Sequence, residues 1–179
     1  FEIDNRGKRS VVLDLRDPVA IDQLHQLLET ADVFVTNVRP AALERLGLGH
    51  DAVLERHPHL VYASLTGYGQ TGPYADQPGY DFVIQGQSGM MSITGPTDGE
   101  PYKLGVAISD VIAGLFAAVS MLGALRHAEA SGQGQRLDIA LGEPLRQTAR
   151  QLRRLHLQCR IRVDPAFPQQ VTVETLQAR

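Results

Sequence analysis

SVVLDLRDPVAIDQLHQLLETADVFVT, residues 10–36, contains three consecutive patterns of secondary structure. Residues 10–15 are rich in branched apolar side chains, which favour a strand. Asp17 and Pro18 then form a helix start, with Asp17 as the N-cap. The helix carries apolar side chains at a spacing that predicts packing on a sheet: Ile21, Leu24, Leu27 and Leu28. Residues 33–36 read as the next strand, so the stretch predicts a βαβ unit with parallel strands.

Strands and helices continue to alternate along the rest of the chain. Further strands are expected at residues 60–65 and 135–141, and helices at residues 40–46, 51–57, 80–92 and 111–128. Gly47 and Pro58 are expected to end the first two of these helices. The order predicts an α/β fold whose ligands bind beyond the carboxyl ends of the strands, where Asn37 lies.

Bulk composition excludes several classes of protein. With 179 residues, 43% of them hydrophobic, the chain can form one domain or a part of a larger one. Its formal net charge of −3 offers no electrostatic case for binding nucleic acid or an anionic membrane. Cys159 is the single cysteine, so neither an intrachain disulfide nor a cysteine-based zinc site is expected, and no histidine spacing suggests a metal.

No secretory signal is visible, and the most apolar stretch, residues 111–125, is too short to span a bilayer. A soluble, cytoplasmic protein is therefore expected.

Asp110 lies where an apolar run ends and the long helix begins. Free backbone N–H groups and the helix dipole favour a negative charge at such a place, so the carboxylate should be ionised near neutral pH. One interpretation makes Ser109 the N-cap and Asp110 a complement to the dipole. The other makes Asp110 a nucleophile or an anchor for a cation.

GYGQTG, residues 67–72, has the letters of the dinucleotide-binding pattern G-x-G-x-x-G. That pattern requires its third glycine in the first turn of a helix, so that the pyrophosphate meets the helix N-terminus. Pro73, Pro78 and Gly79 follow here and prevent a regular helix. We therefore expect a glycine loop beside a pocket, and no NAD binding, although a nicotinamide-dependent dehydrogenase is the alternative that this motif offers.

Several short sequence motifs, taken in order, match those of one enzyme family. They are NRGKRSVVLDL at 5–15, ADVFVTN at 31–37 with Arg39 and Pro40, LERLGL at 43–48, GYGQTGP at 67–73, GYD at 79–81, Asp110, and SGQGQRLD at 131–138. Together they make the chain resemble the class III CoA-transferase family (CaiB/BaiF type) from residue 5 to about residue 142.

The resemblance implies a Rossmann-like parallel sheet with flanking helices, part of the large domain of such an enzyme. Family members transfer coenzyme A from an acyl-CoA donor to a carboxylic acid acceptor. CoA and acyl-CoA are therefore expected as substrates, with no permanently bound cofactor. The catalytic residue implied is Asp110, whose carboxylate attacks the thioester and forms a covalent aspartyl intermediate. Full-length relatives are expected to be interlocked homodimers.

The resemblance also implies which residues bind coenzyme A. They fall in three segments: Leu13, Asp14, Leu15 and Arg16; then Asn37, Val38, Arg39 and Arg45; then Pro78, Gly79, Tyr80 and Asp81 in a loop over the pantetheine and thioester. Guanidinium groups suit phosphate oxygens, although solvated surface charge is the alternative for the three arginines. The racemase branch of the family has a histidine at the position of Tyr80. Tyrosine, with its high pKa, is a poor proton exchanger near neutral pH, so Tyr80 favours transferase over racemase.

The chain departs from the family at both ends. The family's first strand and an associated CoA contact are not recognisable before residue 5, and residues 143–179 do not resemble the family's continuation. That tail holds seven arginines and three acidic residues, whereas the rest of the chain is net negative. We therefore expect a partial large domain over residues 1–142 and a divergent tail over 143–179, as a frameshift or a truncated gene copy would produce. The alternative function is a non-catalytic remnant of the fold.

Overall fold

The structure, a computed structural model, describes residues 5–96 and 98–146. Its helices and strands follow in this order: α2 (Pro18–Leu28), β1 (Val33–Thr36), α3 (Pro40–Arg45), α4 (His50–Arg56), β2 (Val61–Thr66), α5 (Asp81–Gln87), the 3₁₀ helix η1 (Met90–Ile93), α6 (Ile108–Ser131) and β3 (Arg136–Ala140). The predicted α/β fold with a parallel sheet is confirmed.

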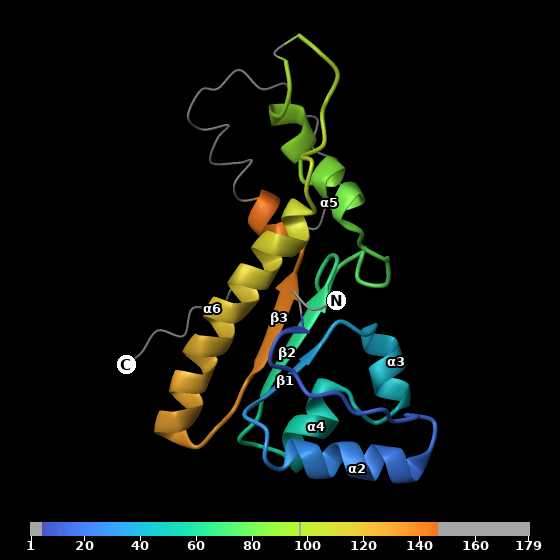
Figure 1. Ribbon diagram of the computed structural model, residues 1–179, viewed down its shortest axis with the longest axis vertical. Helices are drawn as coiled ribbons and strands as arrows, with labels where there is room; N and C mark the ends of the chain where they lie inside the picture. Colours follow the sequence, from blue (N-terminus) through green and yellow to red (C-terminus); the bar gives the residue numbers. More distant parts are fainter. Residues whose placement is uncertain (1–4, 97, 147–179) are drawn as a thin grey trace.

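The strands form one parallel sheet in the order β1-β2-β3, with β2 at the centre (Figure 1). Val33 pairs with Val61, and Tyr62 pairs with Arg136. All three strands therefore point their carboxyl ends toward the same edge, which is the end of the sheet nearest α5 in Figure 1.

Successive residues of β2 face opposite sides of the sheet, as the pleat requires. The fully buried Leu60 precedes the strand, and Tyr62 packs with it against α2, α3 and α4; the Tyr62 hydroxyl donates to the carbonyl of Leu48 at 2.9 Å. Ala63 faces the opposite side and packs against Ala113 and Ala117 of α6. Helices thus cover both faces of β2, which explains why its sequence is almost continuously apolar.

The start of α2 confirms one expectation from the sequence and contradicts another. Asp17 caps the helix by accepting a hydrogen bond from the Val19 N–H at 2.9 Å, and Pro18 is the first helical residue. Leu28 is buried, and Ile21 and Leu24 pack against the core, but Leu27 is exposed. The apolar stripe of α2 is therefore narrower than its sequence spacing predicts.

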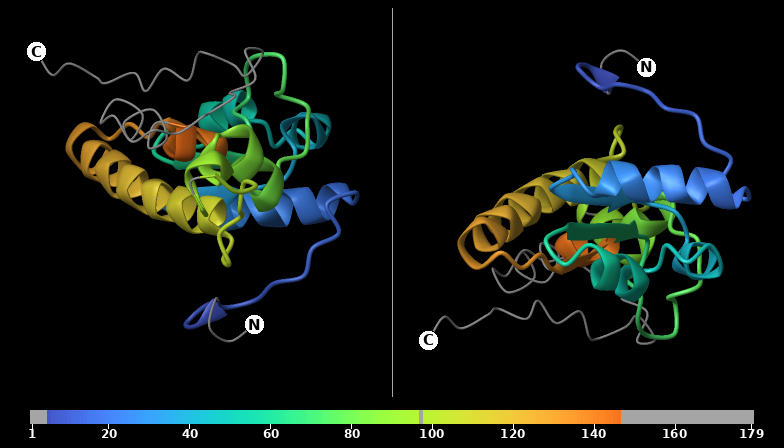
Figure 2. Two further views of the ribbon diagram at one scale, coloured as in Figure 1. Left: turned by 90° about the horizontal axis from the view of Figure 1, so that it is seen from above. Right: turned by 90° about the horizontal axis from the view of Figure 1, so that it is seen from below.

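The strand predicted at residues 10–15 is wrong. Val11 and Val12 are 64% and 93% exposed, and the segment before α2 extends away from the body of the molecule (Figure 2). A strand needs a neighbour for its backbone hydrogen bonds. Within residues 5–96 and 98–146, the paired strands are β1, β2 and β3 alone. The crossovers that do form connect β1 to β2 through α3 and α4, and β2 to β3 through α5 and α6.

The long helix begins earlier and ends later than its sequence predicts. α6 has 24 residues, with Ala107 at its N-cap and Gly132 at its C-cap in the left-handed conformation, at φ 71°. Ser109 is therefore not the N-cap. The estimate that this apolar stretch is too short to span a bilayer is also wrong, because α6 is long and apolar enough by length and composition. Ala113 and Ala117 pack on the sheet, but only 22% of the apolar window of α6 is buried, and Leu115, Val119 and Leu122 are exposed.

Two other expectations need adjustment. The helix expected at residues 80–92 is interrupted at Gly89, whose φ of 84° breaks it into α5 and η1. Residues 142–146 are helical, and Leu145 is fully buried beside Tyr68 and Ile84. The first residues of the predicted tail thus belong to the core, whereas residues 147–179 lie outside the described part of the chain.

A buried histidine pair joins α2 to the end of α4. His25 and His57 are 5% and 3% exposed, and Nδ1 of His25 lies 3.0 Å from Nε2 of His57. Their rings stack with centroids 5.3 Å apart. One nitrogen must donate and the other accept, so the contact needs at least one neutral ring. Burial, followed by nearby positive charge, lowers the pKa of each histidine below its usual value.

The histidine pair predicts loss of stability in mild acid. In the unfolded chain both rings have a pKa of about 6.5, whereas in the folded chain the pKa of each is lower. Around and below that pH the unfolded state therefore binds more protons than the folded state. The free energy of unfolding should therefore fall as pH decreases from 7 to 5, by up to about 1.4 kcal/mol per pH unit for each histidine. Chemical denaturation at a series of pH values measures this slope.

The matched variants are His25→Asn and His127→Asn, since His127 is exposed on α6. We expect the first to flatten the pH dependence and the second to leave it unchanged. Equal slopes in all three proteins would contradict the assignment to this pair.

Candidate functional site

A pocket of about 710 Å³ opens at the carboxyl edge of the sheet. Each strand ends beside it: Asn37 follows β1, Gly67 follows β2, and Leu141 follows β3, and all three line the pocket. Its size is in the range of small-molecule and cofactor sites. The rule that placed ligands beyond the strand ends therefore agrees with the position of this pocket.

The pocket brings together seven of the residues singled out from the sequence. They come from the loops after β1 and β2, from the end of α3 and from the start of α6: Asn37, Arg39, Arg45, Pro78, Gly79, Tyr80 and Asp110. Tyr80 is 73% exposed at the pocket rim. Val38 and Asp81 do not line the pocket, although each is adjacent to a residue that does.

The segment of Leu13, Asp14, Leu15 and Arg16 is not at the pocket either. Arg16 and Asp14 form an exposed ion pair with 2.8 Å between Nη2 and Oδ2, and the Arg16 guanidinium lowers the pKa of Asp14. Leu15 packs against the core beneath α2. Their predicted contacts with CoA stay predictions.

Sequence reasoning did not single out several pocket residues, among them Thr66, Leu65, Asp76 and Gln77. Thr66 is the last residue of β2, so the strand-end rule could have found it. Asp76 and Gln77 lie in the loop between Pro73 and Pro78, and no local pattern signals that they face the pocket.

The loop that closes one side of the pocket crosses itself at two glycines. A Cβ on Gly67 would lie 2.5 Å from the Cα and 2.8 Å from the nitrogen of Gly79. A Cβ on Gly79 would meet the Gly67 backbone just as closely. Both contacts are with backbone, which cannot rotate away as a side chain can. The glycine-rich sequence here serves close packing of two chain segments, and α5 begins only at Asp81, well beyond Gly72.

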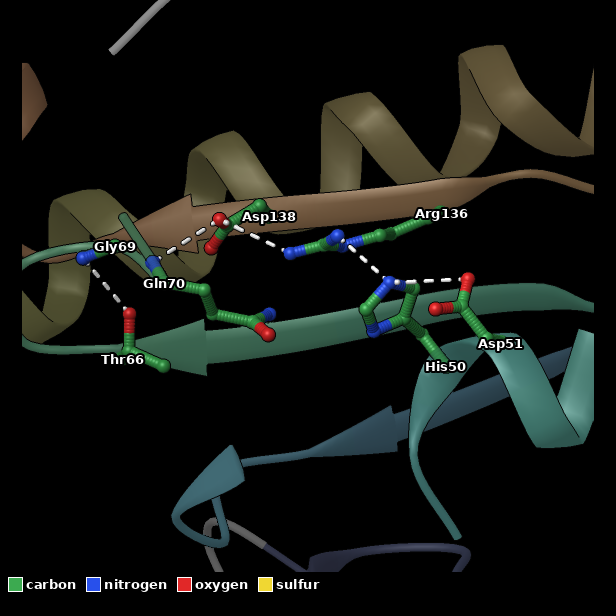
Figure 3. Close-up of polar contacts among 7 residues, drawn as sticks. All are labelled: His50, Asp51, Thr66, Gly69, Gln70, Arg136 and Asp138. Carbon is green, nitrogen blue, oxygen red and sulfur yellow. Dashed lines mark hydrogen bonds and ion pairs between the residues drawn. The ribbon is translucent and has the colours of Figure 1, made fainter. Parts of the chain in front are cut away.

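Side chains of β2 and β3 fix the start of this loop (Figure 3). Thr66 Oγ1 accepts a hydrogen bond from the Gly69 N–H at 2.9 Å, and Asp138 Oδ2 accepts one from the Gln70 N–H at 3.1 Å. Arg136 places Nη2 3.6 Å from the same carboxylate oxygen and donates through Nη1 to Nε2 of His50 at 2.8 Å. The donation requires an unprotonated Nε2 on His50. A polar chain thus runs from α4 across β3 to the glycine loop.

Asp110 lies in the first turn of α6, exposed to the pocket. Partial burial raises the pKa of its carboxyl above the usual value, and the negative charge of Asp81 raises it further. This direction is opposite to the effect of the helix N-terminus alone. A carboxylate with a raised pKa is a better nucleophile once ionised, because it holds its electrons less strongly.

Arg39 is the N-cap residue of α3 and Arg45 its last residue, and both line the pocket. Among residues 5–96 and 98–146 neither guanidinium has an acidic partner at ion-pair distance. Two uncompensated cations in one pocket suit an anion with several oxygens, such as a diphosphate. The described part of the chain holds no cluster of three or more His, Cys, Asp or Glu that could bind a metal ion.

Comparison with known proteins places these features in context. Residues 1–154 match the family model described as CoA-transferase family III. The chain is 46% identical over 141 residues to the succinate–glutarate CoA-transferase of Agrobacterium fabrum, covering 79% of this chain and 35% of that protein. It is 40% identical over 137 residues to the human succinyl-CoA:glutarate CoA-transferase, covering 76% and 31%.

Among solved structures, a CaiB/BaiF family protein from Brucella suis superposes with a TM-score of 0.79 at 39% identity, covering 84% of this chain and 40% of that one. The chain thus spans about a third of the length of these two curated relatives.

Proposed function

The chain belongs to CoA-transferase family III, and from this premise we propose that it transfers coenzyme A from an acyl-CoA to a carboxylic acid through a covalent intermediate on Asp110. The observation that carries the proposal is one pocket that holds a carboxylate of raised pKa at a helix start and two guanidinium groups without an ion-pair partner among the described residues. The carboxylate suits attack on the thioester, and the arginines suit the CoA phosphates.

The proposed reaction has four acyl-transfer steps, in which anhydrides and CoA thioesters alternate. The Asp110 carboxylate attacks the thioester carbonyl, the C–S bond breaks, and CoA leaves as a thiolate with an acyl–aspartyl anhydride left behind. The thiolate attacks the aspartyl carbonyl and releases the donor acid. The acceptor carboxylate then displaces the thiolate to form a second anhydride, and the thiolate attacks the acceptor carbonyl, which frees Asp110. Each tetrahedral step needs hydrogen-bond donors for its oxyanion.

We take the donor to be succinyl-CoA and the acceptor a short dicarboxylic acid, because succinate and glutarate appear in the names of the two relatives. Tyr80 at the pocket rim favours this transfer over racemisation, since a phenol exchanges an α-proton poorly near neutral pH. The proposed location is the cytoplasm. The interlocked homodimer implied by the resemblance stays a prediction.

A transfer assay on the purified chain tests the proposal. The chain is incubated with succinyl-CoA and glutarate, and glutaryl-CoA is measured by mass spectrometry. Trapping with hydroxylamine should label the peptide that contains Asp110. Absence of glutaryl-CoA, and of product from a panel of other dicarboxylic acids, would support a non-catalytic remnant of the fold instead.

Removing the two pocket arginines should weaken CoA binding. Each charge-assisted hydrogen bond contributes about 1.5–3 kcal/mol, so Arg39→Gln with Arg45→Gln should raise the dissociation constant of CoA by roughly 10²-fold or more. Isothermal titration calorimetry measures the effect. The control is Arg126→Gln, since Arg126 is exposed on α6 outside the pocket. An unchanged dissociation constant in the double variant would exclude these arginines from phosphate binding.

A further inference from the structure

Asp81 is a buried acid at the start of α5, and its carboxylate reaches across to the start of α6. It is 8% exposed. Its Oδ1 accepts a hydrogen bond from the Ser109 N–H at 2.8 Å and a second, short one from the Ser109 hydroxyl. Ser109 is fully buried and immediately precedes Asp110. The carboxylate therefore takes the place of a local N-cap, because it occupies one of the free N–H groups of the first turn.

Gln85 extends the same network one turn further along α5. Its Nε2 donates to Asp81 Oδ2 at 2.6 Å and to the carbonyl of Val106 at 3.2 Å, and its Oε1 accepts from the Leu104 N–H at 2.9 Å. Gln85 is fully buried. Asp81 and Gln85 thus hold three points of the segment 104–109 that leads into α6.

This network fixes the backbone at Ser109 through residues that do not themselves line the pocket. Asp110 is the next residue and lines the pocket, so its Cα position follows from the hydrogen bonds that Ser109 makes. A buried carboxylate with satisfied hydrogen bonds holds its partners rigidly, whereas a helix start without a side-chain cap frays. The N-cap residue Ala107 supplies no such bond.

We infer that Asp81, acting through Ser109, is the positioning residue that orients the Asp110 carboxylate in the pocket and places a second negative charge near it. The inference rests on the proposed function for its kinetic consequence, but the orientation and the charge are properties of the folded chain alone. The direction in which Asp81 moves the pKa of Asp110 agrees with such a charge.

The test compares Asp81→Asn and Ser109→Ala with the unaltered chain. The titration of Asp110 is followed by NMR of its carboxyl carbon, and transfer is followed as kcat and KM separately. In Asp81→Asn we expect the pKa of Asp110 to fall, because a neighbouring charge is lost, and kcat to fall at least about 10-fold with KM within about 3-fold. In Ser109→Ala the negative charge of Asp81 remains and loses the hydrogen bond from the Ser109 hydroxyl. The pKa of Asp110 should therefore not fall, while kcat should still decrease.

The matched control is Asp51→Asn, since Asp51 is also an acid in a first helical turn but lies exposed on α4. It should change neither the Asp110 titration nor kcat. If the pKa of Asp110 does not fall in Asp81→Asn, the inference is overturned. If Asp81→Asn does not fold, an unchanged kcat in Ser109→Ala would overturn it. Absence of transfer by the unaltered chain would refute the proposed function, whereas the titration would still decide the role of Asp81.

Discussion

Asp110→Asn should abolish CoA transfer while leaving CoA binding intact. An amide has no negative charge with which to attack a thioester carbonyl, so every route through an aspartyl anhydride is closed. We expect kcat to fall on the order of 10³-fold or more, which corresponds to about 4 kcal/mol in the activation free energy. The dissociation constant of CoA should change by no more than a few-fold, because the proposed phosphate contacts lie at α3.

The structural cost of this substitution should be small. Loss of a charge from a first helical turn costs about 0.3–1 kcal/mol, and here it also relieves the repulsion from Asp81. Asp51→Asn serves again as the matched variant, since it removes an acid from the first turn of α4 and should leave kcat within about twofold. Transfer at an undiminished rate by Asp110→Asn, with the hydroxylamine label on another peptide, would show that the nucleophile lies elsewhere.

Gly79→Ala should destabilise the chain and displace the pocket loop. The added methyl group would overlap the Gly67 backbone, and neither segment can yield by rotating a side chain. Overpacking of this kind costs typically about 1–3 kcal/mol. Because Pro78, Gly79 and Tyr80 line the pocket, the displacement should also weaken CoA binding. Chemical denaturation and calorimetry measure the two effects.

Gly123→Ala is the matched control for this substitution. A Cβ at Gly123, within α6, would meet nothing within 4 Å. Alanine in a helix interior is more favourable than glycine by roughly 0.5–1 kcal/mol, so this variant should be more stable than the unaltered chain. If Gly79→Ala is as stable as the unaltered chain and binds CoA equally well, then the two glycines do not have to touch.

Patterns that depend on neighbouring residues in the sequence predicted most of the fold. Asp17 and Pro18 predicted the start of α2, and the apolar run at residues 60–65 predicted the strand that the structure shows as β2. The strand predicted at residues 10–15 does not form, although its residues favour a strand. In the described part of the chain it has no partner strand. Propensity describes a single segment, whereas a sheet requires two.

Two kinds of evidence in the sequence predicted residues of the candidate site: the positions of the strand ends and the motifs shared with the family. Asn37 follows from the strand-end rule, whereas Asp110 was implied as a site residue by the resemblance to the family. The resemblance implied that Asp81 binds CoA, but the positioning role that we infer for it could not be predicted in this way. Its partner Ser109 lies 28 residues along the chain, and an acid and a serine at that separation form no recognisable pattern. Ser109 was assigned to local capping for the same reason.

The order of strands in the sheet has a consequence for how the chain folds. β1 and β2 pair through Val33 and Val61, but β2 and β3 pair through Tyr62 and Arg136, residues much further apart in the sequence. Distant contacts must recover a larger loss of chain entropy when they form, and topologies rich in them fold slowly. The pocket is lined by Leu141, which follows β3, and by Asp110, which lies between β2 and β3 in the sequence. During synthesis, nearly the whole described chain must therefore leave the ribosome before a site exists.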